Sequence, residues 1–521
     1  MSLPWLILSG FGVFATVVVC LYRLYFHPYA KYPGPFLAKL TNWYAVYHTF
    51  IEDVHTDIWA CHEKYGDIVR YGPNRIVFNT EPGLKAIYGH GANVHKSKGY
   101  EKVSLLPGVH ASISTIDNGR HKLFRRLLNQ GLSDTNIRLM DAKLRKVAVL
   151  FARALGEEQD RHDNTLRHLP LVDGWSIPKN MAHWCDYFTF DVMSELVFGT
   201  SYNLLGNSEN HFVIDGIIAQ MQRFGFLLHF PGLEKMKLHH ILFPQARRKA
   251  TRFYAKSRKI MEERKARGDS DNGSDVFRAL LTANDPETGE SFSNQQLWVE
   301  SNLLIIAGSD TSSTGMAALF FYLSQSPAAY ARVTEEVRMA FSESEVCQGP
   351  KLSSCVYLRA CIQEALRLCP PVTGPLWREV LEGGLFVPQH NIQIPAGCEV
   401  GTGIWSLNHS PKYYPRPHEF CPERWIPEEI GTEHVGLAKA AFASFSVGPR
   451  NCVGKGLAIT EIMLGMATVI AQYDFRRAEP AKIGNVGEGK AVFKGQFQTF
   501  WGFTMMKTGP FIQFRPIEIN A

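Results

Sequence analysis

The sequence predicts a mainly α-helical body with small β-sheets, preceded by a membrane anchor. Its 521 residues are 45% apolar, 12% aromatic and 20% charged, a globular composition that excludes a disordered or collagen-like chain. Helical hydrophobic patterns dominate, and strand-like pieces are confined to stretches near 67–80, 385–402 and 510–515. Length alone favours about three domains. Because the chain has no internal repeat and no long low-complexity stretch, we expect one large domain instead.

The amino-terminal segment is predicted to cross a membrane as a helix. Residues 3–22 carry no charge, and about 20 apolar residues are enough to span the hydrocarbon core. The basic residues that follow are Arg23, His27, Lys31 and Lys39. We expect this positive flank to stay in the cytosol, which places the amino terminus in the lumen. The alternative is a cleaved signal peptide, but its cationic start and a clear small-residue cleavage site are missing.

Proline and glycine mark the boundary between the anchor and the body. The run Tyr32-Pro33-Gly34-Pro35 predicts a stiff, turn-rich hinge. We therefore expect an anchor over residues 1–24, a proline-rich hinge over 25–40 and a single domain over 41–521. Within that domain, the polar, Gly/Ser-rich stretch 264–275 is expected to form a loop.

Charge and cysteine usage exclude several classes of protein. The formal net charge is +6 without any run of five Lys or Arg, so nucleic acid is not an expected partner. The ten cysteines contain no C-x-x-C pair, which argues against zinc ribbons, thioredoxin-type chemistry and iron–sulfur clusters. They are also too sparse for a disulfide scaffold. Most are expected to be small buried residues, with Cys452 as the exception.

Two consecutive helices are predicted near the middle of the chain. Ser293 and Gln296 form a capping-box pattern, and helical character continues to about Ser324, a length of ~45 Å. The pair Ser326-Pro327 then looks like an N-cap followed by a first helical residue. The second helix is expected to end near Met339.

The centre of the long helix has an unusual composition. An apolar run gives way to Gly308 and then to a polar cluster that includes Asp310 and Thr311. Two interpretations remain open. The helix either presents one polar face to water, or opens locally to line a pocket with an acid and an alcohol.

The strongest chemical signal surrounds Cys452. This cysteine ends a glycine-rich turn and precedes an apolar helical stretch over 457–473, where the helix N-terminus favours a thiolate. Gly448 and Gly454 are expected to leave room for a bulky planar group, and Arg450 to pair with an anion on it. A nucleophilic cysteine would need a histidine base, and no signature of a cysteine hydrolase is visible. A metal ligand is the other interpretation.

These residues resemble a known family. The haem-binding signature of the cytochrome P450 family, Phe-x-x-Gly-x-Arg-x-Cys-x-Gly, is matched at all five fixed positions: Phe445, Gly448, Arg450, Cys452 and Gly454. Three further motifs follow the family order: Ala307-Gly308-Ser309-Asp310-Thr311, Glu364-Ala365-Leu366-Arg367 and Pro422-Glu423-Arg424-Trp425, the last with Trp for Phe. The anchor and hinge resemble those of microsomal members, and the general style resembles fungal ones. The resemblance spans nearly the whole chain and implies a helical bundle with small β-sheets around a buried haem.

The resemblance also implies roles for individual residues at the cofactor. Cys452 would be the axial thiolate ligand of haem b, on a loop that also contains Phe445, Gly448 and Gly454. Buried haem propionates need cationic partners. The candidates are Arg450, Arg378, His121 and Arg125. His121 stands where many members of the family carry Trp, whereas Arg125 follows the family pattern.

Two other groups of residues receive roles by resemblance. Glu364, Arg367 and Arg424 are expected to brace the core on the haem side, as structural rather than catalytic residues. Asp310 and Thr311 are expected to handle protons, with Asp310 relaying them through water and Thr311 hydrogen-bonding to dioxygen.

The implied activity is that of a haem-thiolate monooxygenase, plausibly of secondary metabolism, which inserts one oxygen atom from O2 into a small apolar organic substrate. No Gly-x-Gly-x-x-Gly nucleotide loop follows a strand, so electrons would come from NADPH through NADPH–cytochrome P450 reductase, with cytochrome b5 as a possible further partner. The location implied is the endoplasmic reticulum membrane, single-pass, with the catalytic domain cytosolic. Pocket walls are expected from 100–117, 205–243, the middle of the long helix, 372–377 and 497–502.

Two alternatives to the monooxygenase stay open. One is a haem-thiolate isomerase or dehydratase that does not use O2, and the other is a non-catalytic haem sensor. The intact Asp310-Thr311 pair argues against both. Dependence on NADPH and reductase would separate a monooxygenase from an isomerase or dehydratase, and NADPH oxidation stimulated by substrate would exclude a sensor. The apolar cluster within 224–230 contacts either lipid or the protein core.

Overall fold

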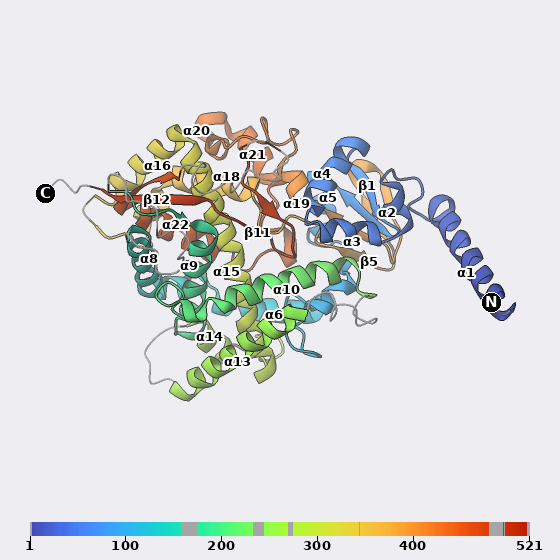
Figure 1. The fold of residues 1–521 in the computed structure, drawn as a ribbon, viewed down its shortest axis with the longest axis horizontal. Coiled ribbons are helices and arrows are strands. Elements are labelled where there is room, and N and C mark those ends of the chain that lie inside the picture. Colours follow the sequence, from blue (N-terminus) through green and yellow to red (C-terminus); the bar gives the residue numbers. More distant parts are fainter. Residues whose placement is uncertain are drawn as a thin grey trace.

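The computed structural model describes residues 3–157, 174–232, 244–268, 275–342, 344–478, 493 and 495–517. Figure 1 shows a mainly helical body, with the helix α1 (Leu3–Leu21) projecting away from it. A short π-helical turn over Tyr22–Phe26 extends α1. The segment Ser9–Phe26 is apolar and long enough to cross a membrane, and none of it is buried against the body.

The helices of the body account for most of its regular structure. In chain order they are α2 (Phe36–Leu40), α3 (Trp43–Phe50), α4 (Val54–Tyr65), α5 (Glu81–Tyr88), α6 (Asn118–Gly131), α7 (Asp134–Leu139), α8 (Asp141–Gly156), α9 (Met181–Phe198), α10 (Phe212–His229), α13 (Pro244–Arg267), α14 (Val276–Thr282), α15 (Asn294–Gln325), α16 (Pro327–Ala340), α17 (Pro350–Ser354), α18 (Val356–Leu368), α19 (Ile404–Asn408), α20 (Pro427–Ile430), α21 (Thr432–Ala441) and α22 (Lys455–Gln472). This confirms the mainly α fold class.

The strands form small sheets, and they include the three predicted stretches together with short strands that the sequence did not predict. The largest sheet has the order β1 (Ile68–Gly72), β2 (Arg75–Phe78), β8 (Glu399–Thr402), β5 (Arg378–Val380) and β3 (Val94–Lys96), and its β2–β8 pair is parallel. The antiparallel sheets are β4 (Lys179–Asn180) with β12 (Phe511–Pro516) and β9 (Tyr473–Arg477), β6 (Leu385–Val387) with β7 (Ile392–Ile394), and β10 (Thr499–Phe500) with β11 (Met506–Lys507).

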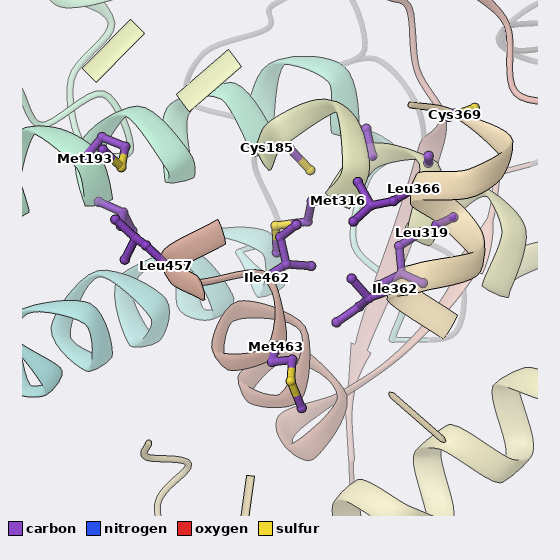
Figure 2. Close-up of a cluster of buried hydrophobic side chains, with 14 of the residues drawn as sticks. Cys185, Met193, Met316, Leu319, Ile362, Leu366, Cys369, Leu457, Ile462 and Met463 are labelled. Carbon is purple, nitrogen blue, oxygen red and sulfur yellow. The ribbon is translucent and has the colours of Figure 1, made fainter. Parts of the chain in front are cut away.

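The long helix α15 is the centre of the fold. It begins one residue after Ser293, whose side chain accepts from the Gln296 N–H while the Gln296 side chain accepts in return, so the capping box is present. The following helix, α16, starts at Pro327 as predicted, but Ser326 makes no side-chain cap there. Figure 2 shows how side chains of α15, α9, α18 and α22 interdigitate in one apolar cluster.

α15 stays helical through its polar stretch. A Cβ at Gly308 would come within 2.6 Å of the Met193 side chain on α9, so glycine here permits close packing of two helices rather than an opening. Ser309, Ser312 and Ser313 are all buried. The polar residues therefore face the protein interior, which excludes the interpretation of a face toward water.

One segment differs from the sequence expectation, and in a second the packing favours one of two open options. The predicted loop 264–275 begins as the last turn of α13, which ends at Arg267, and residues 269–274 lie outside the described residues. The apolar cluster within 224–230 belongs to the core: Phe224, Phe226, Leu227 and Leu228 are buried and Phe230 is partly buried. Lipid contact at this cluster was one of two options, and the described packing favours the other.

Candidate functional site

The loop that carries Cys452 is held by its own backbone and by α5. The Cys452 N–H donates to the Phe445 carbonyl over 2.9 Å, and Gly448 adopts a φ of +71°. A Cβ at Gly448 would lie 1.9 Å from the carbonyl oxygen of Tyr88, at the end of α5, so only glycine fits. Gly448 thus packs the loop against α5, whereas the sequence suggested that it makes room for a planar group. Gly454 does border the cavity beside the loop.

An apolar cavity of about 280 Å³ lies between α15 and the Cys452 loop. On one side, α15 contributes Leu304, Ala307, Gly308, Thr311 and Ser312. On the other side, the loop contributes Phe445, Arg450, Cys452 and Gly454. Cys452 and Thr311 therefore border one mostly apolar cavity, which is the usual setting of a small-molecule site.

The predicted pocket walls are present only in part. Tyr100 and Ile113 come from the stretch 100–117, and Val372 and Leu376 from 372–377. Among the described residues, neither 205–243 nor 497–502 lines the cavity, although Phe503 does.

The pKa of the Cys452 thiol is raised, whereas the sequence led us to expect that the helix N-terminus would favour the thiolate. Cys452 is exposed on its loop, and the surrounding protein raises the pKa of its thiol through desolvation, against the opposing effects of the Gly454 N–H, Arg125 and Lys455. The helix α22 begins three residues later, at Lys455. A metal cation at the sulfur would remove the proton outright, so the site fits a metal ligand better than a free nucleophile.

Three cationic side chains, two of them buried and Arg450 partly buried, lie at one end of the cavity. Lys96, Arg378 and Arg450 line it, and their hydrogen-bond acceptors are backbone carbonyls and the Asn118 side chain. In the described part of the chain, no acidic side chain forms an ion pair with any of the three. Burial and then Arg378 lower the pKa of Arg450 to about 10, and burial and both arginines lower that of Lys96. Glu300 and Asp117 offset part of this effect, and an anion bound beside the three side chains would offset more of it.

The cations and the cysteine together fit a haem. The two propionates would neutralise the cluster of Lys96, Arg378 and Arg450, and Cys452 would reach the iron from the loop. Lys96 was not predicted, because its place at the end of β3 follows from strand pairing with Arg378 on β5 rather than from a motif. Tyr100 also lines the cavity, with its hydroxyl near Arg378.

Two predicted partners of the propionates lie behind the cavity wall. His121 and Arg125 share a face of α6, as expected, but neither lines the cavity. Arg125 donates to the backbone and side-chain oxygens of Asn451 over 2.6 and 2.8 Å, which ties α6 to the residue before Cys452. Burial and the neighbouring cations, Arg450 first, lower the pKa of His121 to about 3, so it contributes no charge.

Asp310 and Thr311 point in different directions. The Thr311 hydroxyl donates to the Ala307 carbonyl over 2.7 Å, so its remaining lone pair can accept a hydrogen bond in the cavity. Asp310 does not line the cavity; its carboxylate accepts from the Thr504 hydroxyl. Burial raises the pKa of Asp310 to about 6, against the effect of Lys507. The acid is therefore held toward the β10–β11 hairpin, one residue before the alcohol.

The expected triad around Glu364 is present and completely buried. Arg367 donates both Nε and Nη2 to the Glu364 carboxylate at 2.9 and 2.8 Å, and Arg424 adds a bond of 2.9 Å. The Trp425 indole N–H donates to the second oxygen at 2.9 Å. Trp425 stands where the family motif has phenylalanine, and its indole N–H is a donor that phenylalanine lacks. Burial raises the pKa of Glu364, but the two guanidinium groups outweigh it and the net shift is downward.

Known proteins match this chain along almost all of its length. The family model described as Cytochrome P450 matches residues 33–493. The chain is 58% identical over 512 residues to the cytochrome P450 monooxygenase apf7 of Gibberella fujikuroi, covering 96% of both proteins. It is 39% identical over 513 residues to the cytochrome P450 monooxygenase atnE of Emericella nidulans, covering 97% of this chain and 96% of the relative.

Proposed function

The chain belongs to the cytochrome P450 family, and from this premise we propose that it is a haem-thiolate monooxygenase that inserts one oxygen atom from O2 into a small apolar organic substrate of secondary metabolism. The proposal extends to haem b as cofactor and to NADPH–cytochrome P450 reductase as electron donor. The matched relatives are fungal proteins named monooxygenases.

One observation carries the proposal: Cys452 and Thr311 border the same apolar cavity, beside a cluster of three cationic side chains. Cys452 would hold the iron, and Lys96, Arg378 and Arg450 would hold the propionates. When bound, the haem supplies the activation of O2 and its transfer to carbon. The chain supplies a dry cavity that orients an apolar substrate and excludes water. Thr311 offers an acceptor oxygen that holds a proton-bearing group in place, and Asp310 delivers protons by turning from Thr504.

The direct test is reconstitution with reductase and NADPH. Incubation with an extract of fungal metabolites is expected to yield products heavier by one oxygen atom, identified by mass spectrometry with and without 18O2. Product formation that persists without NADPH and reductase would instead indicate an isomerase or dehydratase. NADPH oxidation that no metabolite stimulates would indicate a sensor.

Replacing Thr311 with alanine is expected to raise the peroxide released per NADPH several-fold and to lower product in proportion. The variant removes the acceptor oxygen in the cavity, so protons and reduced oxygen leave without reacting with substrate. The measurement is NADPH consumption against peroxide and product. Thr314→Ala is the matched control, because Thr314 lies on the same helix, bonds the Asp310 carbonyl over 3.0 Å and does not line the cavity. Tight coupling in Thr311→Ala would contradict the role.

We also propose a single-pass anchor in the endoplasmic reticulum membrane, with the body in the cytosol. Beyond α1, large apolar side chains on α2 and α3 are strongly exposed, and they lie where the chain leaves the anchor: Phe36, Leu37, Trp43, Tyr47 and Phe50. Trp43 packs edge-on against Phe230 at the end of α10, with ring centroids 5.2 Å apart. A strip of this composition suits the membrane–water interface.

A fluorophore attached at Phe50→Cys is expected to be quenched by a lipid-borne nitroxide when the full chain is reconstituted in vesicles. Phe50 is 71% exposed and belongs to the strip on α2 and α3. The control is Met339→Cys, at a side chain 73% exposed on the distant helix α16, where aqueous iodide should quench instead. Equal quenching by iodide at both positions would contradict lipid contact by the strip.

A further inference from the structure

A short stretch of chain separates the cavity from a second, polar pocket. This outer pocket has a volume of about 630 Å³. Ser114, Thr115 and Ile116 line it, whereas the residue just before them, Ile113, lines the cavity. Residues 111–116, which we call the partition, are thus a single layer of chain with a pocket on each side.

Glu300 on α15 holds the start of the partition. Its carboxylate accepts from the backbone N–H and from the hydroxyl of Ser112, over 2.5 and 2.9 Å. Glu300 is completely buried. Because a buried carboxylate without donors costs several kcal/mol, the two bonds stabilise the acid and the position of the partition together.

The place of Glu300 along α15 puts it between the two pockets. The start of the helix contributes Gln295 and Gln296 to the outer pocket, and Leu304, one turn beyond Glu300, lines the cavity. Glu300 itself lines neither space. Its carboxyl therefore acts on the partition, through Ser112, rather than on a molecule in either pocket.

Two cations hold the rest of the partition by its backbone. Lys96 donates to the Ile113 carbonyl over 2.6 Å. Arg450 donates to the Thr115 and Ile116 carbonyls, each over 2.8 Å. Both cations also line the cavity, and their several N–H donors suffice for these carbonyls and a propionate at once.

We propose that the outer pocket is an entry site for the substrate, and that Glu300 is a positioning residue that keeps the partition closed until a substrate passes into the cavity. The inference deepens the proposed monooxygenase function and rests on it. The polar side chains that line the outer pocket include His95, Glu101, His110, Asp117, Arg120 and Gln295. Since they carry both signs of charge, the pocket suits uncharged hydrogen-bonding groups such as amides or hydroxyls. The substrate class is therefore a molecule that combines such groups with an apolar part, which the cavity takes.

Amide hydrogen exchange of the full chain tests the hold of Glu300 on the partition without turnover. Glu300→Leu removes both acceptor oxygens and is expected to raise the exchange rate over 111–116 by about tenfold. Glu300→Gln should stay close to wild type, because its amide oxygen can still accept from the Ser112 N–H. Ser112→Ala removes one of the two bonds from the other side, at a half-buried position, and should give a smaller rise.

Asp191 provides the matched control for the exchange experiment. Its buried carboxylate on α9 accepts from the N–H groups of Leu204 and Leu205, over 3.0 and 2.9 Å, so it holds a different loop by the same chemistry. Asp191→Leu should raise the exchange rate at residues 204 and 205 and leave that of the partition unchanged.

Binding of 4-phenylimidazole to the ferric holoenzyme, followed by stopped-flow absorbance, tests the entry site. Gln295 is exposed and lines the outer pocket, so Gln295→Trp should lower the association rate several-fold. Glu300→Leu should raise the association and dissociation rates together, because the partition opens more often. Ser353→Trp is the control, since it fills a surface pocket of about 890 Å³ that shares no lining residue with the outer pocket or the cavity.

The outcomes separate this inference from the proposed function. Unchanged exchange over the partition in both Glu300→Leu and Ser112→Ala would overturn the role of Glu300. An association rate in Gln295→Trp equal to that of wild type would overturn the entry site. A purified wild type without haem would count against the monooxygenase proposal, while the exchange result would stand, because it needs no cofactor.

Discussion

Replacing Cys452 with alanine is expected to abolish the red-shifted Soret band of the ferrous–carbon monoxide form. Among the described residues, Cys452 is the one sulfur donor that borders the cavity beside the cation cluster; the other sulfur there, on Met193, packs against Gly308. Thiolate donation to iron is what distinguishes this band from that of haem held by nitrogen. The cations at Lys96, Arg378 and Arg450 remain, so residual haem can still bind by its propionates. Absorption spectroscopy and haem content measure the two effects separately.

Cys361→Ala provides the matched control for the loss of the band. Cys361 is completely buried on α18 and lies away from the cavity lining. Its replacement removes a sulfur from the same protein at a similar packing cost, and the band should be retained. A Cys452→Ala protein with the red-shifted band intact would show that another ligand holds the iron, and the proposed function would fall with it.

The parts of this protein that could be predicted from sequence are those fixed by local rules. The start of α15 at Ser293 follows from reciprocal capping, which involves residues three apart. The Cys452 loop depends on residue types at fixed spacing over ten positions. The Glu364–Arg367 pair needs only one helical turn. In each case the interacting groups are close in the chain, so their spacing in the sequence determines how they lie relative to one another.

The parts that could not be predicted depend on contacts across the fold. Lys96 joins the cation cluster because β3 pairs with β5, and neither strand has a motif. Gly448 is glycine because the Tyr88 carbonyl of α5 approaches it, not because a ligand does. Arg125 turns toward Asn451 rather than into the cavity. Glu461 belongs to an apolar helical pattern, and only the fold places it in the lining of the cavity.

Replacing Glu364 with glutamine is expected to lower the free energy of unfolding by about 3–5 kcal/mol, the usual cost of removing one partner from a buried ion pair. The carboxylate lies between Arg367 and Arg424, and all three side chains are at most 5% exposed. A glutamine keeps the shape but removes the negative charge, and its NH2 group would meet a donor. Two guanidinium groups would then remain buried without a counter-charge. Urea unfolding followed by tryptophan fluorescence measures the change.

A pair of the same composition and spacing on the surface isolates the effect of burial. Arg416 and Glu419 also form an i,i+3 ion pair, at 2.8 Å, but their side chains are 66% and 58% exposed. Glu419→Gln is therefore expected to change stability by less than about 1 kcal/mol. The two pairs have the same residue types at the same spacing. The difference between the two losses in the free energy of unfolding therefore measures the effect of burial on the ion pair. Similar losses for both would mean that the buried triad does not brace the core, and that its match to the family motif has another cause.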